Sequence, residues 1–554
     1  MRRRIGQAVL LWHTVRHLKP VQIGGRAWFR LHRPKPDLAP APALRDRAGP
    51  WVRPAGRQPS QLGPDRFCFL NQEGDLGGGW DDGRRDKLWR YNLHYFDDLN
   101  ADSAQDRVAW HQSLIRRWVA DNPPGVGTGW EPYPTSLRIV NWIKWTLAGN
   151  RLPPEAVQSL AVQARWLSRR LEHHLLGNHL FANAKALVFA GSFFTGDEPA
   201  RWLSRAATIL KREIPEQILD DGGHFELSTM YHALALEDAL DLENLWRAYP
   251  DSRRLTAGID GLVAARIAPM RRWLTAMCHP DGEIAFFNDS AFGVAPPPAA
   301  LDAYASRLGL DPIGPGKAGL LRDSGYARLE AGPSVVLADV ARVGPDYLPG
   351  HAHADTLSFE LSVGWQRVLV NSGTSVYAAG PERLRQRGTA AHNTVVIAGE
   401  NSSEIWSAFR VARRARPFDL SIEDDGSTTV LACSHDGYTR LARGAVHRRT
   451  LILQPGGLTV EDVLAGGADP AEARFHFHPS WDVAVDGAHG RAVSDRGQVV
   501  AWVIEAGTAS IQAGTHHPEF GISLPSACLV VGLEAGRSLV RFTWSSVSSS
   551  SGSI

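Results

Sequence analysis

Four short polar clusters carry side chains that could transfer protons or hold a metal ion. Each cluster lies beside a glycine or at the expected start of a helix or strand. They are Gly177-Asn178-His179, residues 221–232 with Glu226, Tyr231 and His232, residues 351–355 with His351, His353 and Asp355, and His392-Asn393 preceded by Asn371 and Tyr377. Imidazole, phenol and carboxyl groups are the usual general acids and bases of enzymes. Imidazole and carboxylate groups are also zinc ligands.

The third cluster has the most informative spacing. If the strand conformation already holds at residue 351, then His351, His353 and Asp355 point to one face, because side chains alternate along a strand. This spacing favours a metal or proton-transfer site. His392 could add a third imidazole, since ligands on neighbouring strands need no fixed sequence spacing. The alternative is a polar strand edge that faces solvent.

The first two clusters lie at expected helix starts. Asn178 could simply cap a helix, with His179 as an incidental neighbour. Ser228 is a candidate cap that would place Tyr231 and His232 in the first helical turn, at the same end of the helical domain. The alternative for Tyr231 is a position at the rim of the core with its hydroxyl satisfied. These residues indicate a functional site only when they are taken together with the other clusters.

The elements that must position these clusters change character along the chain. From about residue 104 to 280 the pattern is helical, and Val157, Leu160, Ala164, Leu167 and Leu171 form an apolar stripe that follows Pro153-Pro154. Turn-forming runs at 122–125, 195–199, 220–223 and 249–250 separate helices of ordinary length. We therefore expect a stack of paired helices.

Beyond a Pro/Gly-rich stretch at about 295–320 the apolar period becomes two. Leu357, Phe359 and Leu361 alternate with polar residues, and 450–453 with 457–460 is typical of a hairpin. An antiparallel β-sandwich is the expected architecture. The predicted divisions are 1–95 as an N-terminal arm and linker, extended over 33–64, then 96–315 as the helical domain, 316–545 as the sandwich and 546–554 as a serine-rich tail.

Composition narrows the classes of function. A chain of 554 residues exceeds what one hydrophobic core organises, which agrees with two large domains. The formal net charge of +2 argues against a strongly basic nucleic-acid binder, although a local basic cleft could hold an anionic ligand. No stretch reaches the roughly 18 apolar residues of a membrane span. The basic start has only a short apolar run, 8–12, so no clear secretory signal is expected.

The four cysteines form no metal-binding or disulfide pattern. Cys68, Cys278, Cys433 and Cys528 are far apart, with no CxxC spacing. Neither a disulfide framework nor a zinc finger is therefore predicted, and we expect buried thiols.

Taken in order, the four clusters resemble the heparinase II/III family of polysaccharide lyases, over about residues 90 to 480. The resemblance implies an α+β multidomain fold, an incomplete (α/α) toroid followed by an antiparallel β-sandwich, with the substrate cleft between them. It implies β-elimination on a uronate-containing acidic polysaccharide, a glycosaminoglycan or a bacterial exopolysaccharide. It also implies a periplasmic or cell-envelope location, although the start of the chain leaves the cytoplasm open.

The same resemblance implies residue roles. Asn178, assisted by His179 or by a histidine of the other domain, would neutralise the uronate carboxylate. Tyr231 would transfer a proton, and His351 would act as base or neutraliser; sugar stereochemistry decides which of the two is the base. The expected substrate-binding residues are Glu226, His232, Tyr377 and Arg410, the last of which could instead be part of a solvated basic strand.

A zinc site is implied by the family as well. Histidines matching His353 and His392 can hold zinc together with an aspartate from the intervening strand. Here Asn371 stands where that aspartate is expected. An amide oxygen is a neutral and weaker zinc ligand than a carboxylate. The sequence therefore leaves open whether zinc binds, and a bound zinc ion would have a structural role.

Two other functions stay open from sequence. An inverting glycoside hydrolase on a toroid would need two carboxylates about 6.5–9.5 Å apart, and Glu226 with Asp221 or Asp355 are the available acids. A polysaccharide-binding protein of an exopolysaccharide pathway, without catalytic power, is the other. The ultraviolet absorbance of a new C4=C5 double bond would separate a lyase from both.

Overall fold

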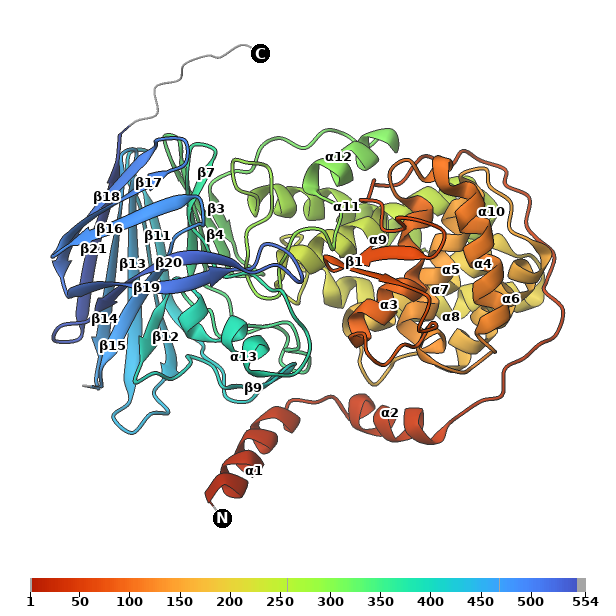
Figure 1. Cartoon of the computed structure of the whole chain (residues 1–554), viewed down its shortest axis with the longest axis horizontal. Helices are drawn as coiled ribbons and strands as arrows, with labels where there is room; N and C mark the ends of the chain where they lie inside the picture. The colour runs from red at the N-terminus through yellow and green to blue at the C-terminus, as the bar shows by residue number, and fades with distance from the viewer. Residues whose placement is uncertain (1, 257, 468, 546–554) are drawn as a thin grey trace, which may run out of the picture.

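The computed structural model describes residues 2–256, 258–467 and 469–545. A helical body and a β-rich body lie side by side, joined through the segments that follow α11 and α12 (Figure 1). The predicted serine-rich tail, 546–554, lies outside the described residues.

The helical body is a ring of antiparallel helices around a tryptophan-rich core. Its helices are α3 (Lys87–Tyr95), α4 (Val108–Asp121), α5 (Pro132–Leu147), α6 (Pro154–Arg169), α7 (Gly177–Phe193), α8 (Asp197–Gln217), α9 (Thr229–Ala248), α10 (Pro250–Leu255), α11 (Ile259–Ala276) and α12 (Pro298–Arg307). Helix α7 packs on α5, α8 and α9. Because α7 is enclosed, it is apolar on nearly all sides. The predicted stack of paired helices is confirmed, and α6 begins at its predicted proline.

The β-rich body is an antiparallel sandwich. One layer is an eight-stranded sheet in the order β11 (Pro417–Asp424), β12 (Thr429–Tyr438), β13 (Ala445–Gln454), β14 (Gly457–Ala465), β21 (Arg537–Trp544), β18 (Val499–Ala506), β17 (His489–Ser494) and β16 (Trp481–Asp486). The predicted hairpin is confirmed, since Gln454 pairs with Gly457 across β13 and β14.

Two smaller sheets form the facing layer. They are β3 (Gly319–Leu321), β4 (Tyr326–Ala331), β5 (Ser334–Asp339), β6 (Phe359–Val363) and β7 (Gln366–Leu369), and the order β19 (Thr508–His516), β20 (Leu524–Gly532), β15 (Ala471–His476) and β8 (Val395–Ile397). One shared apolar core joins all three sheets. Strand β5 is buried on both faces, because Val335 and Leu337 pack with Trp273 of α11. The sandwich is therefore docked firmly on the toroid.

The segment around residues 351–355 is a loop, so the condition that a strand already begins at residue 351 is not met. Its backbone groups bond outside any sheet: the His353 N–H donates to Oδ1 of Asn288 at 2.9 Å, and the Ala354 N–H donates to the Arg387 carbonyl at 2.9 Å. Leu357 has a φ of 64°, which is incompatible with a continuous strand. Regular pairing begins only at β6.

The N-terminal arm contains two helices that its composition did not suggest. Helices α1 (Arg2–Val15) and α2 (Pro20–Leu31) lie along one edge of the molecule (red, bottom of Figure 1). The chain then runs extended over the toroid, as predicted for 33–64, to the small hairpin β1 (Arg66–Phe69) and β2 (Gln72–Asp75). Among the described helices, none has both the length and the apolar character needed to cross a bilayer.

The cysteines carry no cross-link. Cys278, Cys433 and Cys528 are buried thiols, as predicted, whereas Cys68 is partly exposed. The sandwich and toroid are therefore held together by packing and polar contacts.

Candidate active site

Tyr231, His351 and Tyr377 meet at the junction of the two bodies. Ser228 caps α9 by accepting a hydrogen bond from the Tyr231 N–H at 3.1 Å, as predicted, which fixes Tyr231 in the first turn. The Tyr231 ring lies 4.0 Å, centroid to centroid, from the His351 ring. Its hydroxyl is 3.1 Å from the hydroxyl of Tyr377. Burial raises the pKa of Tyr231 well above its usual range, so the phenol keeps its proton at neutral pH.

Asp289 organises the histidines of this site. It follows the strained turn at Asn288, whose φ is 56°, and its side chain is fully buried. Oδ2 of Asp289 is 2.9 Å from Nδ1 of His351, and Oδ1 is 2.8 Å from Nε2 of His353. One carboxylate therefore orients both imidazoles.

The negative charge of Asp289 is balanced by Arg383 on α13 (Pro381–Arg387). The guanidinium is fully buried and forms a two-point ion pair, with Nη2 at 2.6 Å from Oδ2. Burial alone would raise the pKa of Asp289, but Arg383 and the two histidines hold it well below the usual range. Asp289 is therefore ionised, and a charge-assisted bond keeps the proton of His351 on Nδ1.

Glu226 lies on the other side of His351, beside the start of α7. Its Oε2 is 3.6 Å from Nε2 of His351. Gly177 has a φ of 55°, and a Cβ there would lie 3.1 Å from Oε1 of Glu226 and 2.3 Å from Cδ2 of Leu348. The backbone of Asn178 contacts the Glu226 carboxyl, so the partly exposed Asn178 lies beside Glu226. Burial raises the pKa of Glu226, a shift that His351 opposes.

His179 extends the site along α7. Its Nδ1 is 3.2 Å from Oε2 of Glu172, and its ring lies 4.5 Å from that of Tyr133. Burial lowers the pKa of His179, but the Glu172 carboxylate more than offsets this, so the net shift is upward. The imidazole is thus poised to carry a positive charge next to Asn178.

A second cluster of ligand type lies behind His351. Nδ1 of His353 and Nε2 of His392 are 3.2 Å apart, and a carboxylate oxygen of Asp355 lies within 4.8 Å of both. Two nitrogens bound to one tetrahedral zinc ion are about 3.3 Å apart, so this spacing fits. Since Asp289 accepts from Nε2 of His353, the Nδ1 lone pair can face a cation, as in metal-binding histidines whose other ring nitrogen donates to a carboxylate. The residues present fit a divalent metal ion.

Of the remaining predicted residues, Asn371 lies near the histidine cluster and Arg410 lies on an exposed hairpin. Asn371 is buried nearby, with its Oδ1 accepting from the Asn393 N–H at 3.3 Å and its Nδ2 without a partner among the described residues. Arg410 is exposed on the hairpin of β9 (Ile405–Ser407) and β10 (Arg410–Val411), next to Phe409, whose ring is 6.0 Å from His351. Its role in substrate binding stays a prediction.

The expected role of His232 in substrate binding is corrected by its position in the core. Its side chain is fully buried, its Nε2 is 2.9 Å from the Met270 carbonyl, and its Nδ1 accepts from the His224 N–H at 3.2 Å. Its ring also lies 4.3 Å from that of Trp273. Adjacent residues of a helix point about 100° apart, so Tyr231 faces the junction while His232 faces the core.

Asp221, one candidate acid for hydrolysis, is committed to structure. Its carboxylate accepts bonds from the backbone of Gly223 at 2.9 Å and of Ser324 at 2.7 Å. It clamps the loop before α9 to the loop before β4. This leaves Glu226 without Asp221 as a catalytic partner.

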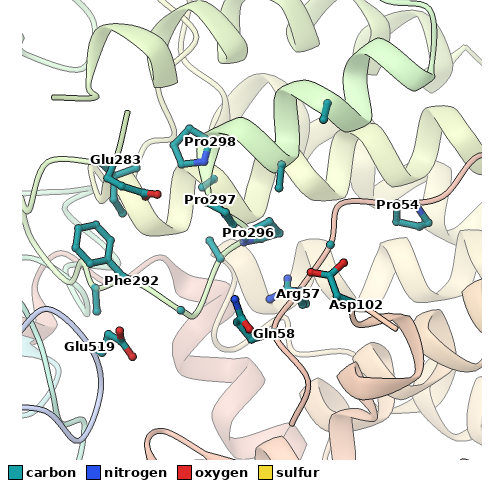
Figure 2. Close-up of a pocket in the computed structure, with 18 of the residues that line it drawn as sticks. Pro54, Arg57, Gln58, Asp102, Glu283, Phe292, Pro296, Pro297, Pro298 and Glu519 are labelled. Atoms are coloured by element: carbon teal, nitrogen blue, oxygen red, sulfur yellow. The ribbon is translucent and has the colours of Figure 1, made fainter. Parts of the chain in front are cut away.

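A cavity of about 600 Å³ lies elsewhere, between the arm, α12 and the 516–524 loop (Figure 2). Arg57, Asp102, Glu283 and Glu519 contribute to its lining, and none of the predicted site residues does. Arg57 is already ion-paired with Glu237. We therefore take the Tyr231–His351 junction, where acid–base groups converge, as the candidate active site.

Sequence reasoning missed Asp289, Arg383 and Tyr133. Asp289 lies in the run Phe287-Asn288-Asp289-Ser290, an Asn-Asp pair after an apolar stretch that is typical of a turn. Arg383 and Tyr133 carry no motif of their own. Arg383 belongs to the site because it is ion-paired with Asp289, and Tyr133 because its ring lies against that of His179.

A helical toroid docked on an antiparallel sandwich, with tyrosine, histidine and amide side chains at the junction, defines the class of protein. The profile "Heparinase II/III N-terminus" matches residues 103–295, and "Heparinase II/III-like, C-terminal" matches residues 314–545. This chain therefore belongs to the heparinase II/III-like family.

Relatives and solved structures agree with this assignment. The chain is 26% identical over 412 residues to FtsZ-localized protein C of Caulobacter vibrioides, covering 68% of this chain and 66% of that one. It is 25% identical over 327 residues to heparin-sulfate lyase of Bacteroides stercoris, covering 56% and 46%. The match thus spans between about half and two thirds of these relatives.

The solved structures define the fold. A crystal structure of heparinase III matches with a TM-score of 0.69 at 20% identity, covering 85% of this chain and 80% of that one. Heparan sulfate lyase HepC from Pedobacter heparinus matches with a TM-score of 0.58 at 19% identity, covering 94% of this chain and 86% of that one. The predicted toroid followed by a sandwich is confirmed.

Proposed function

We propose that this protein is a polysaccharide lyase that cleaves an acidic polysaccharide next to a uronate by β-elimination. The observation that carries the proposal is the contact between the tilted rings of Tyr231 and His351, 4.0 Å between centroids, at the junction of toroid and sandwich. The named activity of the heparin-sulfate lyase relatives supports the same reaction class.

Elimination first needs a neutraliser. The C5 proton of a uronate is weakly acidic because the attached carboxylate is already negative, and more negative charge grows on that group as the proton leaves. Asn178 donates hydrogen bonds to the carboxylate, and a protonated His179 adds positive charge beside it. A donor placed at a developing oxyanion contributes a factor of about 10²–10³ in rate.

The positions of protons favour one division of acid and base. Because Nδ1 of His351 donates to Asp289, Nε2 carries the lone pair and accepts the C5 proton. The electron pair of the C5–H bond forms the C4=C5 double bond, and the C4–O4 bond breaks. Tyr231, whose raised pKa keeps it protonated, delivers its proton to O4. Tyr231 then regains a proton from solvent through the contact of its hydroxyl with Tyr377, and His351 releases to solvent the proton that it accepted.

The test uses a panel of uronate polymers, with ultraviolet absorbance for the new double bond and a parallel assay for reducing ends. Tyr231→Phe is expected to lower turnover by at least a factor of about 10². Tyr249→Phe, at the far end of the same helix, is the matched control and keeps wild-type turnover. Reducing ends without absorbance would mean hydrolysis, and full activity of Tyr231→Phe would remove Tyr231 from the reaction.

We further propose that His353, His392 and Asp355 bind a zinc ion with a structural role. The donor set and the 3.2 Å spacing of the two nitrogens support it. A bound ion would supply a fixed positive charge that holds the loop at 351–355 in place. No proton transfer in the scheme above depends on it.

A further inference from the structure

The N-terminal helices carry an unusual concentration of positive charge. Residues 1–36 contain nine arginine and lysine residues and no aspartate or glutamate. The remainder of the chain has 51 Lys and Arg against 58 Asp and Glu. A chain of nearly balanced charge is thus a basic N-terminal segment attached to an acidic body.

The same helices expose large apolar side chains. On α2, Trp28 is 64% and Leu31 is 83% exposed, and Val21 and Ile23 are also exposed. At 100° per residue these four side chains, with Gly24 and Ala27 between them, fall within one half of the helix circumference. On α1, Val9, Leu11 and Trp12 are exposed in the same way, with Trp12 at 63%.

The opposite sides of both helices are tied to the protein by specific contacts. Nε1 of Trp406 donates to Oγ1 of Thr14 at 3.0 Å, and Nε2 of Gln22 donates to the Tyr347 carbonyl at 3.1 Å. Lys19 is ion-paired with Glu216 of α8. The apolar faces therefore point outward because the polar faces are anchored inward.

A small basic pocket lies under α2. It has a volume of about 80 Å³ and is lined by Trp28, His32, Arg169, Arg170 and Arg205, among others, with no acidic side chain in its lining. The Trp28 and His32 rings stack at 4.5 Å. Arg169 of this lining is already ion-paired with Asp37. Arg205, beside the aromatic wall, is suited to a phosphate group.

We propose that α1 and α2 dock the protein flat on an anionic phospholipid surface. The apolar faces enter the boundary between headgroups and acyl chains, and the arginines beside them contact lipid phosphates. A second copy of this chain is a poor occupant of the face, since two segments of nine positive charges would repel each other. This inference is independent of the proposed lyase activity.

The test is co-sedimentation of the full chain with vesicles of phosphatidylcholine alone or with about one third phosphatidylglycerol. We expect binding only to the anionic vesicles, weakened by raised salt. The double variant Trp12→Ser/Trp28→Ser should bind at least about tenfold more weakly. Trp365→Ser is the matched control, because Trp365 is 74% exposed on the β6–β7 turn, and it should bind like wild type.

Three outcomes would overturn the proposal. The first is an absence of wild-type binding to anionic vesicles, and the second is equal binding by the double variant. The third is a dimer, seen by light scattering, that the double variant abolishes while vesicle binding is absent; that result would assign the face to a second copy. Circular dichroism and thermal melting confirm that every variant is folded.

Discussion

Nδ1 of His351 and Oδ2 of Asp289 lie 2.9 Å apart across the boundary between toroid and sandwich. Asp289 belongs to the segment between α11 and α12, and His351 belongs to the loop between β5 and β6. Arg383, from α13, closes the same ion pair. The orientation of the proposed base is thus set by residues from three separate parts of the chain.

Replacing Asp289 by Asn should lower both stability and activity. It leaves the buried Arg383 without its counter-ion, which costs about 3–5 kcal/mol. It also frees His351 to take the other tautomer, so turnover falls. The free energy of unfolding and kcat are measured together. The double variant Asp289→Asn/Arg383→Met should recover part of the stability and none of the activity; recovery of both would refute an orienting role.

Asn178→Ala should lower kcat by a factor of about 10²–10³ because a donor to the developing charge is lost. The side chain is partly exposed, so the melting temperature should change little. Asn178→Asp keeps the shape but places a negative charge beside the substrate carboxylate, and it should be no more active. An active aspartate variant would show that Asn178 does not contact that group.

Gly177→Ala tests the packing that sets the position of Asn178. The added Cβ would lie 2.3 Å from Cδ2 of Leu348 at a φ of 55°, so the loop with Leu348 or the start of α7 must shift. We expect a loss of about 1–3 kcal/mol and reduced turnover. Adding Leu348→Ala removes the clash, and a double-mutant cycle should show a favourable coupling. Simple additivity would contradict the proposed contact.

Glu226→Gln should make stability less dependent on pH. Burial raises the pKa of Glu226 in the folded protein. A raised carboxyl pKa contributes stability that is complete below the unfolded value of about 4.3 and is lost as pH rises through the folded value. The glutamine variant escapes this loss, so its melting temperature relative to wild type should be higher at pH 8 than at pH 5. Glu73→Gln, at an exposed position, is the control, and an equal difference at both pH values would exclude a buried, titrating Glu226.

Zinc binding should be measurable without activity. Protein loaded with zinc and then desalted should retain about one ion per chain. A chelator should lower its melting temperature, and added zinc should restore it. His392→Ala should bind less zinc and lose the response to the chelator. A wild-type protein that retains no zinc and shows no change in melting would remove the proposed site.

The sequence predicted the architecture well because its periodicities are local. The proline start of α6 and the hairpin of β13 and β14 each depend on residues only a few positions apart. The sequence could not decide whether a strand already holds at 351–355, because alternation alone does not reveal where backbone groups find hydrogen-bond partners. Those partners, Asn288 and Arg387, are more than thirty residues away or on another element.

The candidate site was predictable in its motifs and not in its support. Asn178, Tyr231 and His351 stand in recognisable clusters. Asp289 gains its role only when the fold places it between His351 and His353, with Arg383 as its counter-ion. His232 shows the opposite error. It shares a motif with Tyr231, yet the helical turn sends its ring into the core beside Trp273.

The hairpin of β9 and β10 contacts helix α1 on one side and the candidate active site on the other. On one side, Trp406 is bonded to Thr14 of α1; on the other, only three residues further, Phe409 stands against the rings of His351 and Tyr377. The hairpin that places Phe409 against His351 therefore also supports the first helix. A surface that binds α1 from outside is therefore separated from His351 and Tyr377 only by the hairpin of β9 and β10.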